Sequence, residues 1–404
     1  MSFQQGLSGL SAASQNLDVI GNNVANANTV GFKQSQAQFA DVYANSLAGS
    51  GSSGAGIGVK VAAIQAQFNQ GNIRTTSNPL DLAINGRGFF RLEDRGSVTY
   101  SRNGQFHVDK DGYIVNASGS KITGFGVDAQ GNLMVGNAVP LQLSTAQLQA
   151  TPTANAQIGM NLDSREPTIT AAFSLGNPTT YNKATSLTVY DSLGNPHTLA
   201  TYFTKSAANT WQVNGALDGA SLGLLGTLKF NTNGSLNASG SSLPYSISTP
   251  LTNGAVTPFA MKVDFSNATQ YGSVFSVDTL NQDGFTSGML SGYSVSDDGT
   301  VLGRYSNGAT RTLGQIELAN FANPEGLQPI GQSSFAETNA SGQAIPGTPG
   351  SSNFGVLQSG ALEESNVDLT QELVNMITAQ RVYQANAQTI KTQDQVMNTL
   401  VNLR

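Results

Sequence analysis

Both ends of this chain carry apolar residues at helical spacing without turn signals, whereas the long middle is rich in turn signals. Neither Gly nor Pro occurs from Ala361 to Arg404. Apolar residues that recur at alternating spacings of three and four predict a long helix in this segment, with Gln380 and Asp394 as polar interruptions. The predicted stripe consists of Leu369, Leu373, Met376, Ile377, Tyr383, Ala387, Ile390, Met397 and Val401.

The start of this helix also has a local signature. Either Ser365 or Asp368 can act as the N-cap, and Asp368 or Gln371 three positions later would complete a capping box. At about 1.5 Å per residue, some 35 residues reach roughly 50 Å, whereas a small domain is only about 30 Å across. We therefore expect the helix to project beyond a single core.

A second stripe lies at the amino end and consists of Phe3, Leu7, Leu10, Leu17, Ile20 and Val24. Gly6, Gly9 and Gly21 weaken this segment as an isolated helix, so its stability must come from packing. Burying the large residues of the carboxyl stripe would contribute on the order of 10 to 20 kcal/mol, an upper bound that requires a partner surface. We expect both helices to pack against other copies in a coiled-coil-like inner layer.

The middle of the chain is predicted to be mainly β-structure. Asn-Gly occurs at 85, 103, 214, 233, 253 and 307, and Asp-Gly at 111, 218, 283 and 298. These pairs favour tight hairpin turns, and alternating apolar runs lie between several of them. The predicted strands cover residues 89–92, 98–100, 105–108, 113–115, 186–190, 199–204, 227–230, 261–265, 292–295, 300–305 and 314–318.

Shifts in composition near residues 145–156 and 279–288 indicate nested, discontinuous domains. We predict a terminal helical domain (1–30 with 362–404), a connector (31–75 with 355–361), an inner β domain (76–148 with 282–354) and an inserted outer β domain (149–281). Within the connector, residues 46–58 alternate Gly with small residues, which is typical of a flexible linker.

Composition excludes several classes of partner. The net charge of -6 and the pI near 4.9 argue against binding to nucleic acid or anionic lipid. The chain has no Cys, so disulfides and thiolate chemistry are absent. The first 17 residues carry no charge and no continuous apolar run, so we expect no cleaved signal peptide. No stretch of 18 apolar residues predicts membrane insertion.

The sequence offers no enzymatic motif. The two histidines, His107 and His197, lie in hairpin contexts without an evident second ligand, and we interpret them as surface strand or turn residues. The run Asp109 to Gly112 fits a hairpin turn better than a calcium loop. Trp211, the single tryptophan, is interpreted as a core anchor. We predict no catalytic, cofactor or metal site.

Two terminal segments resemble the signatures of the bacterial flagellar rod and hook protein family. Residues 22–33, with the sequence NNVANANTVGFK, resemble the amino-terminal signature; residues 362–369 and 380–387 resemble the carboxyl-terminal one. Shorter similarities occur at 88–90, 100–106 and 318–321. The family motif positions are Asn22, Asn23, Asn26, Gly31, Phe32, Lys33, Ser365, Asn366, Asp368, Gln380 and Arg381.

This resemblance implies a non-enzymatic subunit that assembles with many copies of itself. The length near 400 is similar to that of hook-type members, whose flexible tube would join rod to filament around an export channel. It also implies rod, hook cap and hook–filament junction proteins and the export apparatus as partners, and secretion to the flagellum. A distal rod subunit, an extracellular β-rich adhesin or binding module, and a dimeric coiled-coil scaffold remain alternatives. The asparagines at 22–28 suit both the end of a helix and contacts between subunits.

Overall fold

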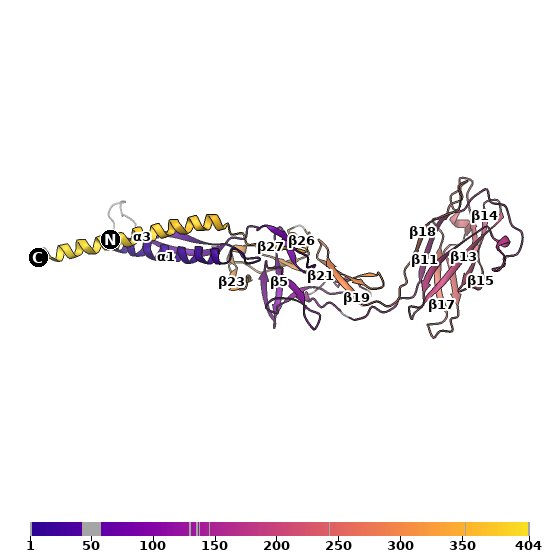
Figure 1. Ribbon diagram of the computed structural model, residues 1–404, viewed down its shortest axis with the longest axis horizontal. Helices are drawn as coiled ribbons and strands as arrows, with labels where there is room; N and C mark the ends of the chain where they lie inside the picture. Colours follow the sequence, from indigo (N-terminus) through magenta and orange to yellow (C-terminus); the bar gives the residue numbers. More distant parts are fainter. Residues whose placement is uncertain are drawn as a thin grey trace. The chain divides into compact units, whose positions relative to one another are not determined.

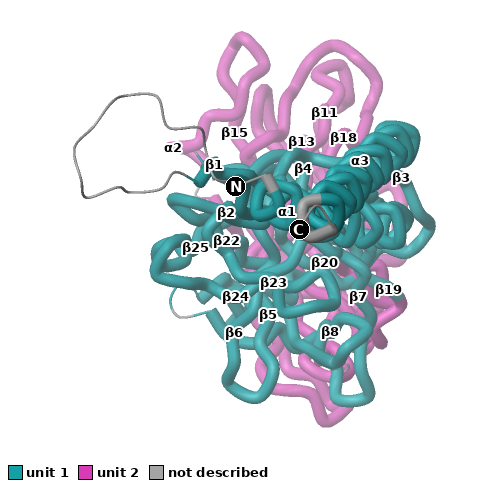
Figure 2. Tube along the Cα trace, turned by 90° about the vertical axis from the view of Figure 1, so that its left-hand side faces the viewer, with its two compact units in different colours: residues 1–144, 292–303, 311–404 teal, residues 145–291, 304–310 magenta. Residues whose placement is uncertain are grey.

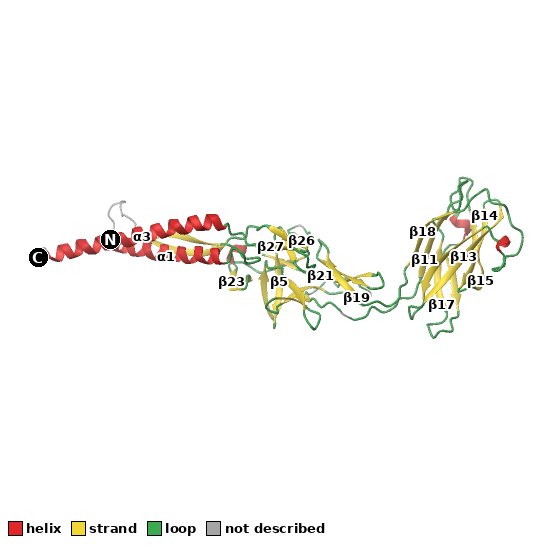
Figure 3. Cartoon of the chain, viewed as in Figure 1, coloured by secondary structure: helices red, strands yellow, loops and turns green. Residues whose placement is uncertain are grey.

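The computed structural model describes residues 2–42, 58–128, 131–134, 136, 138–144, 146–241, 243–351 and 353–402. The chain forms two compact units, shown in Figure 2. Unit 1 comprises residues 1–144, 292–303 and 311–404, and unit 2 comprises residues 145–291 and 304–310. The predicted fold class is confirmed, because strands dominate the middle and a long helix lies at each end (Figure 3). No described helix has the length and apolar content needed to cross a bilayer.

The two long helices of unit 1 pack side by side and antiparallel (Figure 1). Helix α1 spans Ser2–Ala25 and helix α3 spans Leu369–Asn402. Gly6 near the start of α1 faces Ile390, and Gly9 faces Asn386 of α3. A Cβ atom added to Gly9 would lie 2.9 Å from the Asn386 amide. The glycines that weaken α1 as a free helix therefore permit the close approach of α3.

The start of α3 is capped by Asp368. Its Oδ1 accepts hydrogen bonds from the backbone N–H groups of Thr370 (2.9 Å) and Gln371 (3.1 Å). The Gln371 side chain donates to Asn375, so the reciprocal bond of the expected capping box is not made. The other predicted cap, Ser365, accepts instead from the Val367 N–H.

Three strands occupy the segment 31–75 that was expected to act as a connector. Strands β1 (Ser35–Val42) and β2 (Gly58–Ala66) form an antiparallel ladder that packs on α1, and β3 (Ile73–Thr75) pairs with β27 (Ala361–Glu363). Buried and exposed positions in β1 and β2 are occupied largely by small and polar residues. The apolar–polar alternation that predicts a strand is therefore weak in this part of the sequence. The predicted glycine-rich linker, apart from Gly58, lies outside the described residues.

Most of the remaining unit 1 strands join a sheet with thirteen strands in the described residues. Its main path runs β19-β20-β21-β9-β5-β6-β24-β23, and β4 pairs separately with β26. Phe89, Tyr100, Phe321 and Phe335 pack in its core with edge-to-face contacts. The bounds are β4 Leu82–Asn85, β5 Phe89–Asp94, β6 Ser97–Ser101, β7 Phe106–Val108, β8 Ile114–Asn116, β9 Lys121–Phe125, β10 Val139–Pro140, β19 Leu290–Val295, β20 Thr300–Tyr305, β21 Thr310–Ile316, β22 Leu318–Asn320, β23 Gln328–Gly331, β24 Ser334–Ala336, β25 Ile345–Gly347 and β26 Val356–Ser359, with a 3-10 turn at Pro324–Gly326.

Unit 2 is a sandwich of two four-stranded sheets, β16-β17-β11-β18 and β12-β13-β14-β15. One core joins them, and the predicted anchor Trp211 is fully buried there with its Nε1–H donating to Gln270. The bounds are β11 Asn155–Asn161, β12 Lys183–Tyr190, β13 Pro196–Ala207, β14 Thr210–Leu217, β15 Ala220–Lys229, β16 Tyr245–Thr249, β17 Phe259–Asp264 and β18 Ser276–Gln282, with a 3-10 turn at Pro178–Thr180 and a short helix α2 at Ala238–Ser241.

Two expectations from local sequence prove wrong in unit 2. Asn214-Gly215 lies within β14 rather than in a turn, because Gly215 accommodates the Leu225 side chain of β15. His197, expected at the surface, is only 9% exposed and lies between two carboxylates. The turn predicted at Asp109 is present: its Oδ1 accepts from the N–H groups of Asp111 and Tyr113.

Candidate assembly surface

The two terminal signatures meet at a buried ion cluster in unit 1. Lys33 Nζ lies 2.6 Å from Glu363 Oε1, and Arg102 Nη1 lies 3.0 Å from Glu363 Oε2. The side chains of Lys33 and Glu363 are fully buried, and that of Arg102 is 4% exposed. Lys33 also donates to the Asn69 carbonyl, and Arg102 to the carbonyls of Ile84 and Gly86. One carboxylate thus joins the amino end, the carboxyl end and the β structure.

Electrostatics make Glu363 the indispensable member of this cluster. Burial lowers the pKa of the Lys33 amine, and the Arg102 charge lowers it further. Burial likewise lowers the pKa of Arg102. The Glu363 carboxylate acts in the opposite direction on both cations, through charge and through hydrogen bonds. Without it, two cations would remain buried next to each other.

Two asparagines of the signatures fix the start of β1. Asn23 is 1% exposed, and its amide exchanges two hydrogen bonds with the backbone of Ser35, at 2.8 and 2.9 Å. Asn366 accepts from the Gln34 N–H at 2.7 Å and donates to the Gln67 carbonyl at 2.8 Å. The Gln34 side chain in turn donates to Glu372 of α3. These bonds attach α1 and the segment that leads into α3 to the same point, the start of β1.

The remaining signature residues occupy mixed environments. Asn26 donates to the Asn22 carbonyl at the end of α1, while the Asn22 side chain is exposed. Gly31 is buried with φ +68°, and its N–H donates to the Glu363 carbonyl. Phe32 is half-buried. Gln380 and Arg381 are exposed on α3, where they are available to another molecule.

The contact between α1 and α3 uses small residues more than the predicted stripes. Ala12, Ala13 and Ala379 are buried, and among the predicted residues of α1 Ile20 is buried, at 5% exposure. The predicted residues Leu10, Leu17, Val24, Met376 and Ile390 are half-buried. A straight helix drifts relative to a heptad repeat, so only part of each stripe turns toward the partner helix.

The other part of the stripes faces solvent. Leu7, Leu369, Leu373, Ile377, Tyr383 and Met397 are between 38% and 60% exposed, and the side chain of Val401 lies outside the described residues. We call Leu7, Leu10, Leu17, Leu369, Leu373 and Ile377 the apolar ridge. Four of its members are exposed, whereas Leu10 and Leu17 are half-buried. Large aliphatic side chains left uncovered along one helix pair mark a surface for association.

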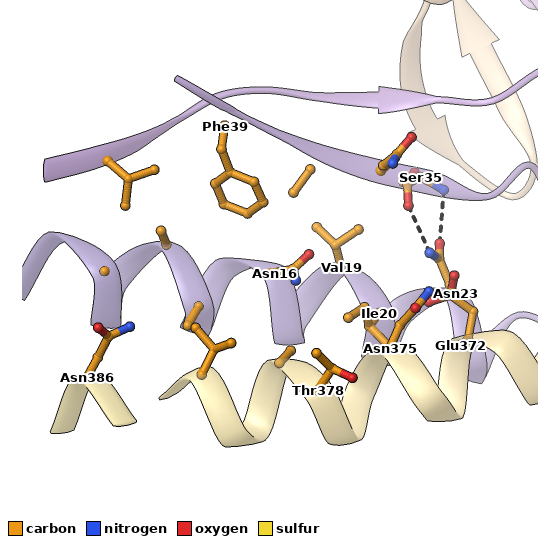
Figure 4. A pocket seen from close by; sticks show the side chains of 18 of the residues that line it. Asn16, Val19, Ile20, Asn23, Ser35, Phe39, Glu372, Asn375, Thr378 and Asn386 are labelled. Carbon is orange, nitrogen blue, oxygen red and sulfur yellow. Dashed lines mark hydrogen bonds between the residues drawn. The ribbon is translucent and has the colours of Figure 1, made fainter. Parts of the chain in front are cut away.

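A groove of about 820 Å³ lies between α1, α3 and the β1–β2 ladder (Figure 4). We call it the small-residue groove, because Gly9, Ala12 and Ala13 line it on α1, followed toward the end of the helix by Asn16, Val19 and Ile20. Phe39 of β1 borders it on one side, and Thr378 and Val382 of α3 border it on the other. Narrow side chains on the floor leave room for a bulkier side chain from outside.

The apolar ridge and the small-residue groove lie on opposite flanks of the helix pair. At about 100° per residue, Leu369, Leu373 and Ile377 point roughly 170° away from the groove-lining residues Asn375, Thr378 and Val382. On α1, the same count places the mean direction of Leu7, Leu10 and Leu17 about 120° from that of the groove-lining residues Gly9, Ala12, Ala13 and Asn16. One flank therefore projects apolar side chains, and the other is hollowed.

Sequence reasoning missed several residues of this region. Glu363 and Arg102 lie in segments that resemble the family, at 362–369 and 100–106, but no role was predicted for either, and Gln34 and Glu372 carried no local signal. Each acts through a partner far away in the chain. The separation is 330 positions for Lys33 and Glu363, 261 for Arg102 and Glu363, and 338 for Gln34 and Glu372. Only a family alignment, or the structure, would have found them.

In this chain two terminal helices pack together, and the β units lie between them in the sequence, one inserted within the other. This arrangement defines the flagellar axial class of protein, and the family profiles agree with that class. Residues 3–33 match the flagella basal body rod protein family, and residues 358–403 match the C-terminal family of flagellar basal body rod FlgEFG proteins. Residues 83–171 match the flagellar hook protein FlgE/F/G D1 domain, and residues 161–285 match the flagellar basal body protein FlaE D2 domain. The chain belongs to the flagellar hook protein FlgE family.

Full-length relatives support this membership. The chain is 46% identical to the flagellar hook protein FlgE of Escherichia coli and 47% identical to that of Salmonella typhimurium, over 100% of each chain. The crystal structure of Helicobacter pylori flagellar hook protein FlgE2 matches with a TM-score of 0.53, at 13% identity, over 72% of this chain and 100% of that one. This last likeness concerns the fold alone.

Proposed function

We propose that this chain is a structural subunit of the flagellar hook that polymerises into a flexible helical tube. In this role it transmits torque from the rod to the filament and encloses an export channel. Membership of the hook protein family supports the proposal. The observation that carries it is the apolar ridge, because six large side chains of the terminal helices have no full cover within the chain.

The geometry favours a specific mode of assembly, in which the ridge of one subunit enters the groove of the next. The two surfaces differ and lie on opposite flanks, so the contact is heterologous. A heterologous contact that does not close a ring generates an open helical polymer. Burying the ridge would also supply the apolar association energy that a lone subunit lacks.

The wider context follows from the same family membership. We propose that the subunit is exported without a cleaved signal peptide, and that rod, hook cap and hook–filament junction proteins and the export apparatus are its partners. We further propose that it has no catalytic role and needs no cofactor. The support is membership of the flagellar hook protein family.

Substitutions on the two flanks test this mechanism. Leu373→Asp places a charge on the ridge, and Thr378→Trp fills the groove from its α3 border. Both side chains are exposed, so circular dichroism should show that both variants fold. We expect neither variant to form tubes in negative-stain micrographs or fast-sedimenting polymers. Thr392→Asp, an exposed substitution on another face of α3, should polymerise normally.

Mixing the variants separates a heterologous contact from a symmetric one. Leu373→Asp keeps an intact groove and Thr378→Trp keeps an intact ridge, so their mixture should give a two-subunit complex that does not grow. Normal tubes formed by Leu373→Asp alone would show that the ridge is not the assembly surface. Failure of Thr392→Asp to assemble would show that the assembly surface extends beyond the ridge and the groove.

A further inference from the structure

A buried histidine in unit 2 contacts two carboxylates at once. His197, the second residue of β13, has Nδ1 2.6 Å from Asp218 Oδ2 and Nε2 3.2 Å from Asp191 Oδ2. The side chains of His197 and Asp191 are 10% and 0% exposed, whereas that of Asp218 is half-exposed. Only an imidazolium can donate a hydrogen bond to both carboxylates, because a neutral imidazole has one N–H group.

The two carboxylates are held differently by the rest of unit 2. Asp191 Oδ1 accepts from the N–H groups of Leu193 and Asn195, and its Oδ2 accepts from the side chains of Asn195 and Asn253. Apart from His197, Asp218 accepts the N–H of Thr198 at 2.8 Å. Asp191 therefore connects the 191–195 turn to the loop that contains Asn253. The His197 imidazole connects both of these to β13, where it lies, and to Asp218 of the 218–219 turn.

The 191–195 turn also packs on the two extended segments, around Ala150 and Thr286, through which the unit 2 sequence enters and leaves. A Cβ atom on Gly194 would lie 2.8 Å from the Ala150 Cβ and 3.1 Å from Thr286. These two segments pair through the isolated antiparallel bridges Leu148–Gly288 and Thr151–Phe285. The same turn also binds the loop at 250–258, because the Val256 N–H donates a hydrogen bond to Ser192 Oγ at 2.8 Å. His197 thus contacts, through Asp191, a turn that holds both the 250–258 loop and the two paired segments.

We propose that His197 is a proton-operated clip, which holds the 191–195 turn and the 250–258 loop in place when the imidazole is protonated and loosens them when it is neutral. In the neutral ring, Nδ1 keeps its hydrogen for Asp218, which has the shorter contact and fewer other donors. The Nε2 lone pair then faces Asp191 Oδ2 without a proton between them. This repulsion acts on the carboxylate that anchors both the turn and the loop.

The charged groups that face the imidazole are Asp191 from the 191–195 turn and Asp218 from the 218–219 turn. Residues 250–258 carry no ionisable side chain, and the Phe259 ring packs beside the imidazole at 6.1 Å. Burial alone lowers the pKa of His197, but the hydrogen bonds and charges of Asp218 and Asp191 raise it above 6.5. Burial raises the pKa of Asp191 and Asp218, but hydrogen bonds lower both below 3.8.

The sign of the pH dependence follows from these directions. Because the folded pKa of His197 is raised, its contribution is fully present below about 6.5 and is lost as the pH rises through the raised pKa. The contribution of the two carboxylates to stability is fully present above their ordinary pKa of about 4. It is lost as the pH falls through their lowered folded-state pKa values. The clip is therefore closed between about pH 4 and 6.5 and opens on the alkaline side.

Hydrogen–deuterium exchange of the full chain, corrected for the intrinsic rate at each pH, tests the clip. From pH 6 to pH 9, protection of peptides covering 191–197 and 250–258 should fall by about tenfold for each unit by which the His197 pKa is raised. Peptides from β14, in the same core, should keep their protection. His197→Gln should remove the pH dependence, whereas His107→Gln, which changes an exposed histidine of unit 1, should preserve it.

A second variant keeps the test decisive if His197→Gln unfolds unit 2. Asp218→Asn removes one of the two charges, so the midpoint of the protection change should move to lower pH. A purely structural role would instead lower protection equally at all pH values. The proposal is overturned if the wild-type protein shows the same protection of both peptides at pH 6 and pH 9, or if Asp218→Asn leaves the midpoint unchanged.

Discussion

Glu363 Oε1 accepts a 2.6 Å hydrogen bond from Lys33 Nζ, although 330 positions separate the two residues in the chain. The bond joins the segment after the first helix to the segment before the last one. Because Arg102 shares the same carboxylate, the cluster also attaches both helices to the β structure of unit 1. Stability of the helix pair and of the sheet should therefore be coupled.

Replacing Glu363 with Gln should strongly destabilise unit 1. The amide preserves shape but leaves two buried cations without their anion, a loss of about 3 to 5 kcal/mol. Urea unfolding followed by far-UV circular dichroism at helix wavelengths measures it. Trp211, the single tryptophan, lies in unit 2, so its fluorescence is an internal control and should keep its midpoint.

The neighbouring residue provides a matched control for this prediction. Glu364 pairs with Arg74 at 3.2 Å, but their side chains are 44% and 62% exposed. Glu364→Gln should therefore change the free energy of unfolding by only about 0 to 1 kcal/mol. Equal effects of the two substitutions would show that the buried cluster adds nothing beyond a surface ion pair.

Gly31→Ala should destabilise unit 1 more than Gly96→Ala. Both glycines have positive φ, +68° and +84°, which costs an L-residue roughly 1 to 2 kcal/mol. A Cβ on Gly31 would in addition lie 2.4 Å from the Asn103 backbone nitrogen, whereas nothing lies within 4 Å at Gly96. Urea midpoints of the two variants measure the difference; indistinguishable values would contradict the close approach.

Asp368→Ala should lower the stability of α3 by about 1 kcal/mol, because two N–H groups of the first turn lose their acceptor. Asp394→Ala changes the same residue type in the middle of the helix, where its side chain is exposed. That substitution should stay within about 0.5 kcal/mol. Helix content and urea unfolding give both values, and a larger loss for Asp394→Ala would rule out the cap.

Removing residues 152–284 should leave assembly through the terminal helices intact while altering the flexibility or curvature of the tubes. Thr151 and Phe285 face each other in an antiparallel bridge, so an Asn-Gly turn can join them. Negative-stain micrographs of the shortened chain measure tube formation and curvature. Complete loss of tubes would mean that unit 2 is required for polymerisation.

The sequence by itself determined the helices at both ends, the β character of the middle and the family. These features depend on local patterns: spacing of three and four in α3, alternation in strands such as β12 and β13, and Asn-Gly or Asp-Gly turns. Seven of the ten predicted turn glycines adopt positive φ, namely Gly86, Gly112, Gly219, Gly234, Gly254, Gly299 and Gly308. The exceptions, such as Gly215, are governed by packing from another strand.

Only the tertiary structure decided which side of each helix is covered and which polar residues are buried together. Leu373 and Met376 belong to one predicted stripe, yet the first is exposed and the second half-buried, because the direction of α1 fixes the covered side. Lys33, Arg102 and Glu363, like His197 and its two aspartates, gain their roles from partners that folding brings together. The free energy of such contacts depends on burial and distance in space, and neither quantity is encoded in a short window of sequence.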